Sequence, residues 1–340
     1  MKAGDRVKGF VSFVDFAATV LNLAGIDIPD QMDGKPFMGK NVNANELNRR
    51  DQTYGYADRM DEKYDMVRSY RKGNFKYIRC YHPFQFDGLM NNYRNKMLAS
   101  QEWLDLYKKG ELNELQSRFF KSRNPEMLFD LKNDPLETRD LSGDHAYSEI
   151  LHDMRNELQS WEKNMPDISF YPEFVLVAEA FDQPVEFGIS HINEIVSYID
   201  IANLQLIDFQ DARPSILSNL GSDDPWARYW ALIVCSSFGE PDRELVQVAR
   251  ELCLTDPELI NRVRAAEFLG LIGLDDPEET MISALYASED PTEALLILNT
   301  IVLMQDGEHQ YHFDIDPEEI NEKVANTEQV ERRLSYLIRE

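Results

Sequence analysis

The chain has 340 residues, a hydrophobic fraction of 43% and an aromatic fraction of 11%, which exclude a disordered protein and favour two or three folded domains. Its formal net charge of −26 at pH 7 argues against nucleic acid as the main partner. Because no apolar run reaches the roughly 18 residues of a membrane span and no basic-then-apolar leader begins the chain, we expect neither a membrane span nor a signal peptide.

The charge is unevenly distributed along the chain, and the three cysteines are widely separated. Residues 63–123 carry 13 Lys and Arg against 6 Asp and Glu, whereas residues 208–340 carry 10 against 28. Only the basic part favours an anionic ligand, although a solvated charged surface without a binding role is the commoner case. Cys80, Cys235 and Cys253 lie far apart and form no CxxC pair, so we expect buried or idle thiols.

A helix is predicted near the start of the chain, in the segment FAATVLNLA. Asp15 is expected to cap its N-terminus, and Gly25 stands where the helix should end. The segment is apolar on nearly every side, which is typical of a helix buried in a large core.

The middle of the chain predicts a small α+β unit. MVRSYRKGNFKYIRCY has two strand-like runs around the turn residues 72–74, and residues 127–131 predict a short strand. Between them, two helices are expected on either side of Gly110. The segment HAYSEILHDMRNELQSWEKN predicts a covering helix, because Ile150, Met154, Leu158 and Trp161 share one face. A hairpin, a helical insert, a strand and a covering helix together predict a small antiparallel sheet with covering helices.

The segment after residue 207 is an internal repeat. The pairs Arg228 and Arg262, and Gly239 and Gly273, are each 34 residues apart. Asp-Pro at 224–225, 256–257 and 290–291 predicts an N-cap followed by proline at the first helical position. Two helices per unit at this period predict an α-solenoid of HEAT-like repeats.

Two features of the repeat resemble metal sites but have simpler explanations. The paired carboxylates at 223–224 and 275–276 precede predicted helix starts, where capping accounts for them. His309 and His312 have a spacing that suits zinc, but no further ligand pair accompanies them. We therefore expect no metal site in this chain.

Three segments resemble the C-terminal part of bacterial sulfatases of the alkaline-phosphatase superfamily. They are FVDFAATVLNLAGIDIPDQMDGKPF, YDMVRSYRKGNFKYIRCYHP and MLFDLKNDPLETRDLSGD, in the family's order and spacing over residues 4–165. Ala18 replaces the usual proline of the first segment, and Phe129 replaces the usual tyrosine of the third. The helical tail resembles a subgroup in which helical repeats follow the sulfatase core.

The resemblance implies hydrolysis of sulfate esters or sulfamates, for which this chain lacks the catalytic parts. In the family, a formylglycine made in a C/S-x-P/A-x-R motif is the nucleophile, and a divalent cation, usually calcium, binds the sulfate group. No cysteine or serine here has that motif. The nucleophile and metal ligands of the family lie upstream of the first segment, so no catalytic residue, metal ligand or cofactor is assigned to this chain.

The resemblance also implies that this region forms one wall of the substrate pocket. Arg59, Asp61, Arg68 and His82 are the candidate substrate-binding residues. Arginine suits an anionic sulfated sugar, and a histidine beside aromatic residues suits a sugar ring. The alternative for each is an ordinary polar residue of a strand edge or loop.

The expected domains are a remnant of the catalytic α/β domain (1–45), the sulfatase C-terminal α+β subdomain (46–168), a linker and first helix (169–206) and HEAT-like repeats (207–340). We interpret the chain as the C-terminal portion of a sulfatase for sulfated polysaccharide, inactive alone and a truncated gene product or fragment. Residues 1–45 should then expose an unusual apolar surface or dock irregularly. Localisation cannot be read from this chain, and is periplasmic or secreted if the full-length protein follows the family.

Two other functions remain open. The first is a non-catalytic binding or scaffold protein that captures a protein partner through its acidic repeats, a capture that removal of residues 207–340 should abolish. The second is an intact metal-dependent hydrolase, which predicts stoichiometric metal after purification.

Overall fold

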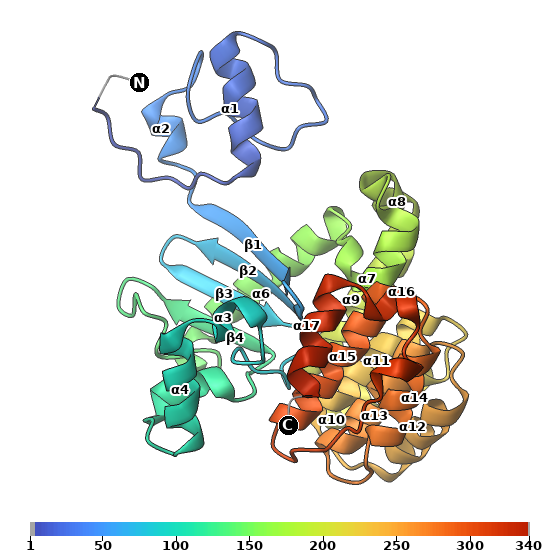
Figure 1. Cartoon of the computed structure of the whole chain (residues 1–340). Coiled ribbons are helices and arrows are strands. Elements are labelled where there is room, and N and C mark those ends of the chain that lie inside the picture. The colour runs from blue at the N-terminus through green and yellow to red at the C-terminus, as the bar shows by residue number, and fades with distance from the viewer. Residues whose placement is uncertain (1–3, 339–340) are drawn as a thin grey trace. The chain divides into compact units, whose positions relative to one another are not determined.

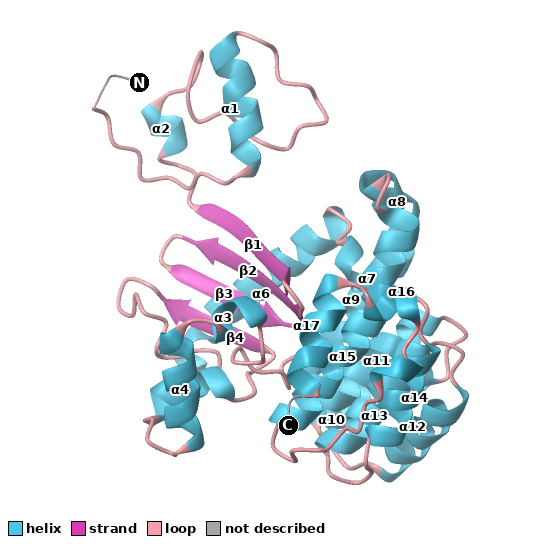
Figure 2. Ribbon diagram, viewed as in Figure 1, coloured by secondary structure: helices cyan, strands magenta, loops and turns pink. Residues whose placement is uncertain are grey.

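A four-stranded antiparallel sheet and a long series of helices make up the chain (Figures 1 and 2). The structure, a computed structural model, describes residues 4–338. The sheet has the order β1-β2-β3-β4. Its strands are β1 (Gln52–Met60), β2 (Lys63–Lys72), β3 (Phe75–Cys80) and β4 (Glu126–Asp130). The α+β class is confirmed.

The predicted hairpin corresponds to β2 and β3, and the predicted short strand to β4. Gly73 between β2 and β3 has a φ of 56°, a left-handed conformation that glycine adopts at low cost. β1 was not predicted, because its segment QTYGYADRM has no buried residue and no apolar alternation.

The first helix, α1 (Val14–Ala24), ends as predicted and begins differently. Gly25 closes it with a φ of 74°, and its N–H donates to Asn22 O. The prediction that Asp15 caps the N-terminus is wrong, because Phe13 holds the cap position and Asp15 lies in the first turn. The Asp15 carboxylate instead accepts from the backbone N–H of Ser12 at 3.1 Å and of Lys35 at 2.8 Å, which ties a distant loop to the helix.

The outer face of α1 is apolar and exposed. Phe13 just before the helix is 90% exposed, and Val14, Val20 and Leu23 are 57–63% exposed. The three buried positions within the helix are Asp15, Ala18 and Thr19. This exposure agrees with the prediction of an apolar surface on residues 1–45, as far as the described residues 4–45 show it.

Short helices occupy the insert between β3 and β4, and one long helix follows β4. The insert contains α3 (Asn92–Asn95), α4 (Leu98–Lys108) and α5 (Glu114–Ser117). Gly110, with a φ of 69°, separates α4 from α5 as predicted. After β4, α6 (Ser148–Asn164) is the predicted covering helix, and Leu151, Met154 and Leu158 form its buried face.

The remaining helices form an array in which several sequence neighbours are in contact, and in which α9, α11, α13, α15 and α17 contact one another in succession. The contacting pairs include α10 with α11, α12 with α13, α9 with α11, α11 with α13, and α13 with α15. The helices are α7 (Glu173–Val175), α8 (Pro184–Ser190), α9 (Ile192–Ala202), α10 (Phe209–Leu220), α11 (Pro225–Phe238), α12 (Arg243–Thr255), α13 (Leu259–Leu271), α14 (Glu278–Ala287), α15 (Pro291–Asp306), α16 (Glu322–Ala325) and α17 (Glu328–Leu337).

Two of the three predicted Asp-Pro caps are confirmed, and one is corrected. Asp224 and Asp290 accept from the backbone N–H groups at the starts of α11 and α15, each followed by proline. Asp256 is not the cap residue, because α13 begins at Leu259 and Glu258 holds its cap position. Its fully buried carboxylate accepts from the backbone N–H of Glu258 at 3.0 Å and pairs with Arg228 of α11 at 2.7 and 2.9 Å.

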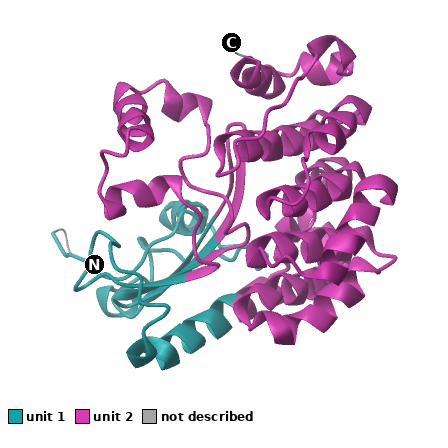
Figure 3. Ribbon diagram, turned by 90° about the horizontal axis from the view of Figure 1, so that it is seen from below, with its two compact units in different colours: residues 1–56, 68–78, 127–158 teal, residues 57–67, 79–126, 159–340 magenta. Residues whose placement is uncertain are grey.

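The chain divides into two compact units (Figure 3). Unit 1 comprises residues 1–56, 68–78 and 127–158, and unit 2 comprises residues 57–67, 79–126 and 159–340. Unit 2 therefore combines the β1–β2 connection with the helical array. Over residues 4–338, no helix is both long and apolar enough to cross a membrane.

Candidate functional site

The turn between β1 and β2 carries two of the predicted substrate-binding residues. Asp61 and Glu62 connect the strands, and Asp61 has a φ of 50°, which aspartate tolerates better than most residues. Asp61 is partly exposed. Arg59 lies at the end of β1 and donates from Nη1 to the backbone oxygen of Glu62 at 3.2 Å.

The guanidinium of Arg59 is engaged by a carboxylate. Its Nε lies 2.6 and 2.7 Å from the two carboxylate oxygens of Glu173 in α7, and its Nη2 also contacts Glu173. Both side chains are mostly buried, at 16% and 22% exposed. A sulfate group at Arg59 would therefore compete with an existing ion pair.

Arg68 lies on β2 in unit 1 and is buried, at 1% exposed. Its guanidinium carbon lies 5.9 Å from the ring centroid of Tyr56, within the range of a cation–π interaction. A substrate contact by Arg68 would require the side chain to become exposed.

His82 is fully enclosed within unit 2. It is 1% exposed, and its ring centroid lies 5.9 Å from those of Tyr64 and Phe84 and 6.0 Å from that of Trp230. Neither ring nitrogen has a hydrogen-bond partner among the described residues. Desolvation by burial, and then the charge of Arg264, lower the pKa of His82 to about 3, so the ring is neutral at pH 7. The aromatic neighbours that the sequence indicated are present, but they bury the histidine.

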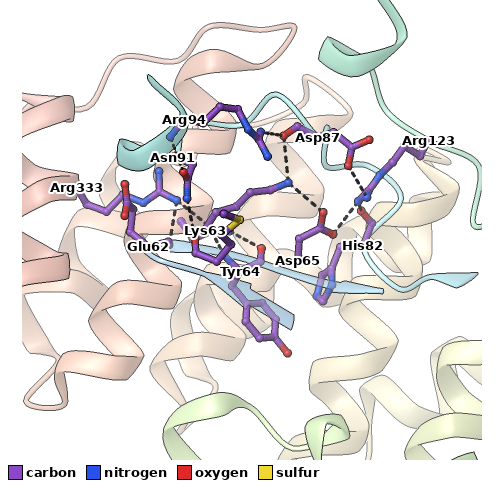
Figure 4. Close-up of polar contacts among 12 residues, drawn as sticks. Glu62, Lys63, Tyr64, Asp65, His82, Asp87, Asn91, Arg94, Arg123 and Arg333 are labelled. Carbon is purple, nitrogen blue, oxygen red and sulfur yellow. Dashed lines mark hydrogen bonds and ion pairs between the residues drawn. The ribbon is translucent and has the colours of Figure 1, made fainter. Parts of the chain in front are cut away.

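A buried ion cluster lies beside the turn, and reasoning from sequence missed it (Figure 4). Asp65 accepts from Lys63 Nζ at 3.2 Å and from Arg123 Nη2 at 2.7 Å. Arg123 Nη1 also donates to Asp87 at 3.1 Å. Desolvation opposes the charge on Asp65, but Arg123 and Lys63 outweigh it and lower the Asp65 pKa. Lys63 and Asp65 are two residues apart in β2 and therefore lie on the same face of the strand, which is a signal that the sequence offered. No sequence signal indicated Arg123.

The described residues do not fit the cofactors that a sulfatase uses. Residues 4–338 contain no group of three or more His, Cys, Asp or Glu arranged to hold a metal ion. Cys80 is buried, and burial raises the pKa of its thiol to about 11, which disfavours the reactive thiolate. Two residues whose sequence pattern resembles a metal site have protein partners. His309 Nε2 lies 3.2 Å from Leu271 O, and the Asp275 carboxylate pairs with Arg250 at 2.7 Å.

Comparison with known proteins finds a similarity in the first third of the chain. Residues 1–124 match the family model described as "N-sulphoglucosamine sulphohydrolase, C-terminal". This segment is thus similar to a sulfatase C-terminal part. An "Ulvan-active sulfatase" of Formosa agariphila is 37% identical over 180 residues, which cover 52% of this chain and 30% of that protein. A second protein of the same name and organism is 25% identical over 175 residues, covering 49% of this chain and 32% of that protein.

The chain spans about a third of the length of these curated relatives. The sulfatase-like part includes α1, the strands β1 to β3 and the insert helices, and therefore all four predicted substrate-binding residues. The comparisons support a sulfatase-related function for this chain.

Proposed function

We propose that this chain is the C-terminal portion of a sulfatase that acts on a sulfated polysaccharide, and that it contributes a wall of the substrate pocket but no catalytic group. The observation that carries the proposal is the match of residues 1–124 to a sulfohydrolase C-terminal family model. The two relatives are named ulvan-active sulfatases, which supports a sulfated polysaccharide as the substrate.

The exposed face of α1 supports the same proposal. A contiguous apolar surface on a soluble protein marks an interaction site, whereas single exposed apolar residues need no explanation. Phe13 and Phe16 stack with ring centroids 5.5 Å apart, and Val20 and Leu23 extend the surface by one and two turns. In the proposal, this face packs against the catalytic α/β domain, which also holds the formylglycine and the calcium ion.

Asp61 and Arg59 are the proposed contacts of the pocket wall. Asp61 is partly exposed in a turn, where its carboxylate can accept hydrogen bonds from sugar hydroxyl groups. Arg59 is paired with Glu173 and holds the turn, so an anion would reach its guanidinium by competing with that ion pair. Arg68 and His82 remain candidates only for a state in which their side chains are exposed.

We further propose that α10 to α17, within residues 207–340, are HEAT-like repeats and that the full-length protein is periplasmic or secreted. The alternate contacts of α9, α11, α13 and α15 support a stack of helical hairpins. The localisation rests on the family resemblance alone.

The scaffold alternative is favoured by the acidic excess of residues 208–340. Removing the repeats is an unsuitable test of it, because they share unit 2 with residues 57–67.

A chimaera tests the proposal. The C-terminal third of the 37% identical sulfatase is replaced by this chain, and turnover of an aryl sulfate and of ulvan is measured. We expect the chimaera to turn over both, and the 340-residue chain alone to turn over neither. A folded chimaera without activity, or turnover by the chain alone with stoichiometric metal, would contradict the proposal.

Matched variants of the chimaera test the role of α1. Serine at Phe13, Val20 and Leu23 should abolish turnover, because the catalytic domain loses its apolar contact surface. Serine at Leu98, Leu136 and Leu254, which are 78–81% exposed and scattered over other elements, should leave turnover unchanged. Equal effects of the two triple variants would remove α1 from the proposal.

A further inference from the structure

The β1–β2 turn is held by side chains from elements far away in sequence. Arg333 of α17 donates from Nη2 to the backbone oxygen of Glu62 at 3.0 Å, although 271 residues separate the two. Asn91, at the start of α3, donates from Nδ2 to the backbone oxygen of Met60 at 2.7 Å. Figure 4 shows Arg333 and Asn91 beside Glu62. The turn is therefore restrained by the C-terminal helices as well as by its own strands.

Arg333 is a buried connector. It is 0% exposed, and its guanidinium also donates to Met90 O at 2.9 Å and to Asn299 Oδ1 at 2.9 Å. Burial lowers the pKa of Arg333 to about 10, so the side chain keeps its charge at pH 7. A buried guanidinium that donates to three different oxygens fixes those oxygens relative to one another.

Asn299 of α15 binds the first residues of β2 in the way a neighbouring strand would. Its Oδ1 accepts from the backbone N–H of Tyr64 at 3.0 Å, and its Nδ2 donates to the backbone oxygen of Tyr64 at 3.3 Å. Asn299 is 1% exposed. Its Oδ1 is shared with Arg333, so α15 and α17 act on the turn as one unit.

Side chains satisfy each backbone oxygen of the turn. Met60 O accepts from Asn91, Asp61 O accepts from Arg59 at 3.4 Å, and Glu62 O accepts from Arg59 and Arg333. Asp61 has a positive φ, a backbone conformation that persists only where the surroundings determine it. These contacts restrain the backbone that carries the partly exposed Asp61 side chain.

We infer that Asn299 and Arg333 are positioning residues for substrate selection, because they hold the turn that presents Asp61 to the sulfated sugar. The helical array then has a role in the substrate site itself, although no residue of α15 or α17 touches the sugar. This inference rests on the proposed function. It also predicts that a change in the array alters selectivity without any change in the wall residues.

Hydrogen exchange and ligand binding on the full 340-residue chain test the inference. In Arg333→Met and Asn299→Leu, the backbone amides of residues 60–64 should exchange about tenfold faster, as expected for the loss of buried hydrogen bonds to the turn. The same variants should bind a sulfated ulvan oligosaccharide about fivefold more weakly, because Asp61 is no longer fixed. Arg333→Lys, which keeps the charge and one donor group, should restore part of both effects.

Arg332→Met is the matched control, because the neighbouring Arg332 pairs only with Glu328 on the surface among the described contacts. It should change neither exchange nor binding. Unchanged exchange of residues 60–64 in Arg333→Met and Asn299→Leu would overturn the inference, as would faster exchange with undiminished binding. A wild-type chain that does not bind the oligosaccharide would contradict the selection role, while exchange still reports on the turn and turnover by the chimaera reports separately on the proposed function.

Discussion

Acid should destabilise the protein through His82, and replacing this residue by phenylalanine should remove that effect. The pKa of His82 is about 3 in the folded chain, against roughly 6.5 for an unfolded histidine. Between these values the unfolded state binds the additional proton, so stability falls as the pH drops below about 6.5 and continues to fall until about 3. At about pH 5 the difference of roughly 1.5 pH units corresponds to about 2 kcal/mol.

Urea unfolding followed by circular dichroism measures this difference. His82→Phe keeps a ring among Tyr64, Phe84 and Trp230 and has no titrating group. The free energy of unfolding of the wild type relative to His82→Phe should fall by about 2 kcal/mol between about pH 7.5 and pH 5. Burial raises the pKa of the Glu267 carboxyl group, so this group makes the protein more stable as the pH falls, opposite to His82. Because both proteins contain Glu267, its effect cancels in the difference between them.

His152→Gln is the matched control, because His152 lies on α6 with an exposed side chain. It should retain the full pH dependence of the wild type. A constant difference between wild type and His82→Phe across this pH range would refute the burial of a neutral His82.

Two further substitutions, one in each unit, test contacts within that unit, and each has a control variant. Arg228→Met removes the cationic partner of the buried Asp256 carboxylate and should lower the free energy of unfolding by about 3 kcal/mol. Arg250→Met breaks an exposed pair, so its urea midpoint should not change measurably. Gly34→Ala would place a Cβ 2.0 Å from Val14 O, so the backbone amides of α1 should lose protection from hydrogen exchange. In the control Gly143→Ala, the new Cβ meets no atom within 4 Å, so hydrogen exchange should not change. Equal effects of Arg228→Met and Arg250→Met would contradict the stabilising role of the buried ion pair, and equal effects of Gly34→Ala and Gly143→Ala would contradict the close approach of Gly34 to Val14.

Much of the local structure could be predicted because it depends on neighbours in sequence. Glycine with a positive φ ends α1 at Gly25 and turns the β2–β3 hairpin at Gly73. Asp224 and Asp290 begin helices through bonds to backbone groups two and three residues away. Asp256 has the same local signal and accepts from the backbone N–H of Glu258 at 3.0 Å, but its carboxylate also pairs with the distant Arg228, and the helix begins at Leu259.

The candidate site could be predicted only in part, because its properties come from distant residues. The partner of Arg59 is Glu173, 114 residues further on, and no local pattern indicates it. Trp230 of α11 contributes to the burial of His82, so the aromatic setting was visible in YHPF but the enclosure was not. Arg333 and Asn299 reach the β1–β2 turn from the last helices of the chain.

The DNA upstream of the Met1 codon tests the central claim most directly. If this chain is the C-terminal portion of a sulfatase, the open frame should continue upstream of Met1 and encode a C/S-x-P/A-x-R motif together with the carboxylates of a calcium site. A stop codon directly before Met1 in an intact gene, with no sulfatase frame next to it, would contradict the claim.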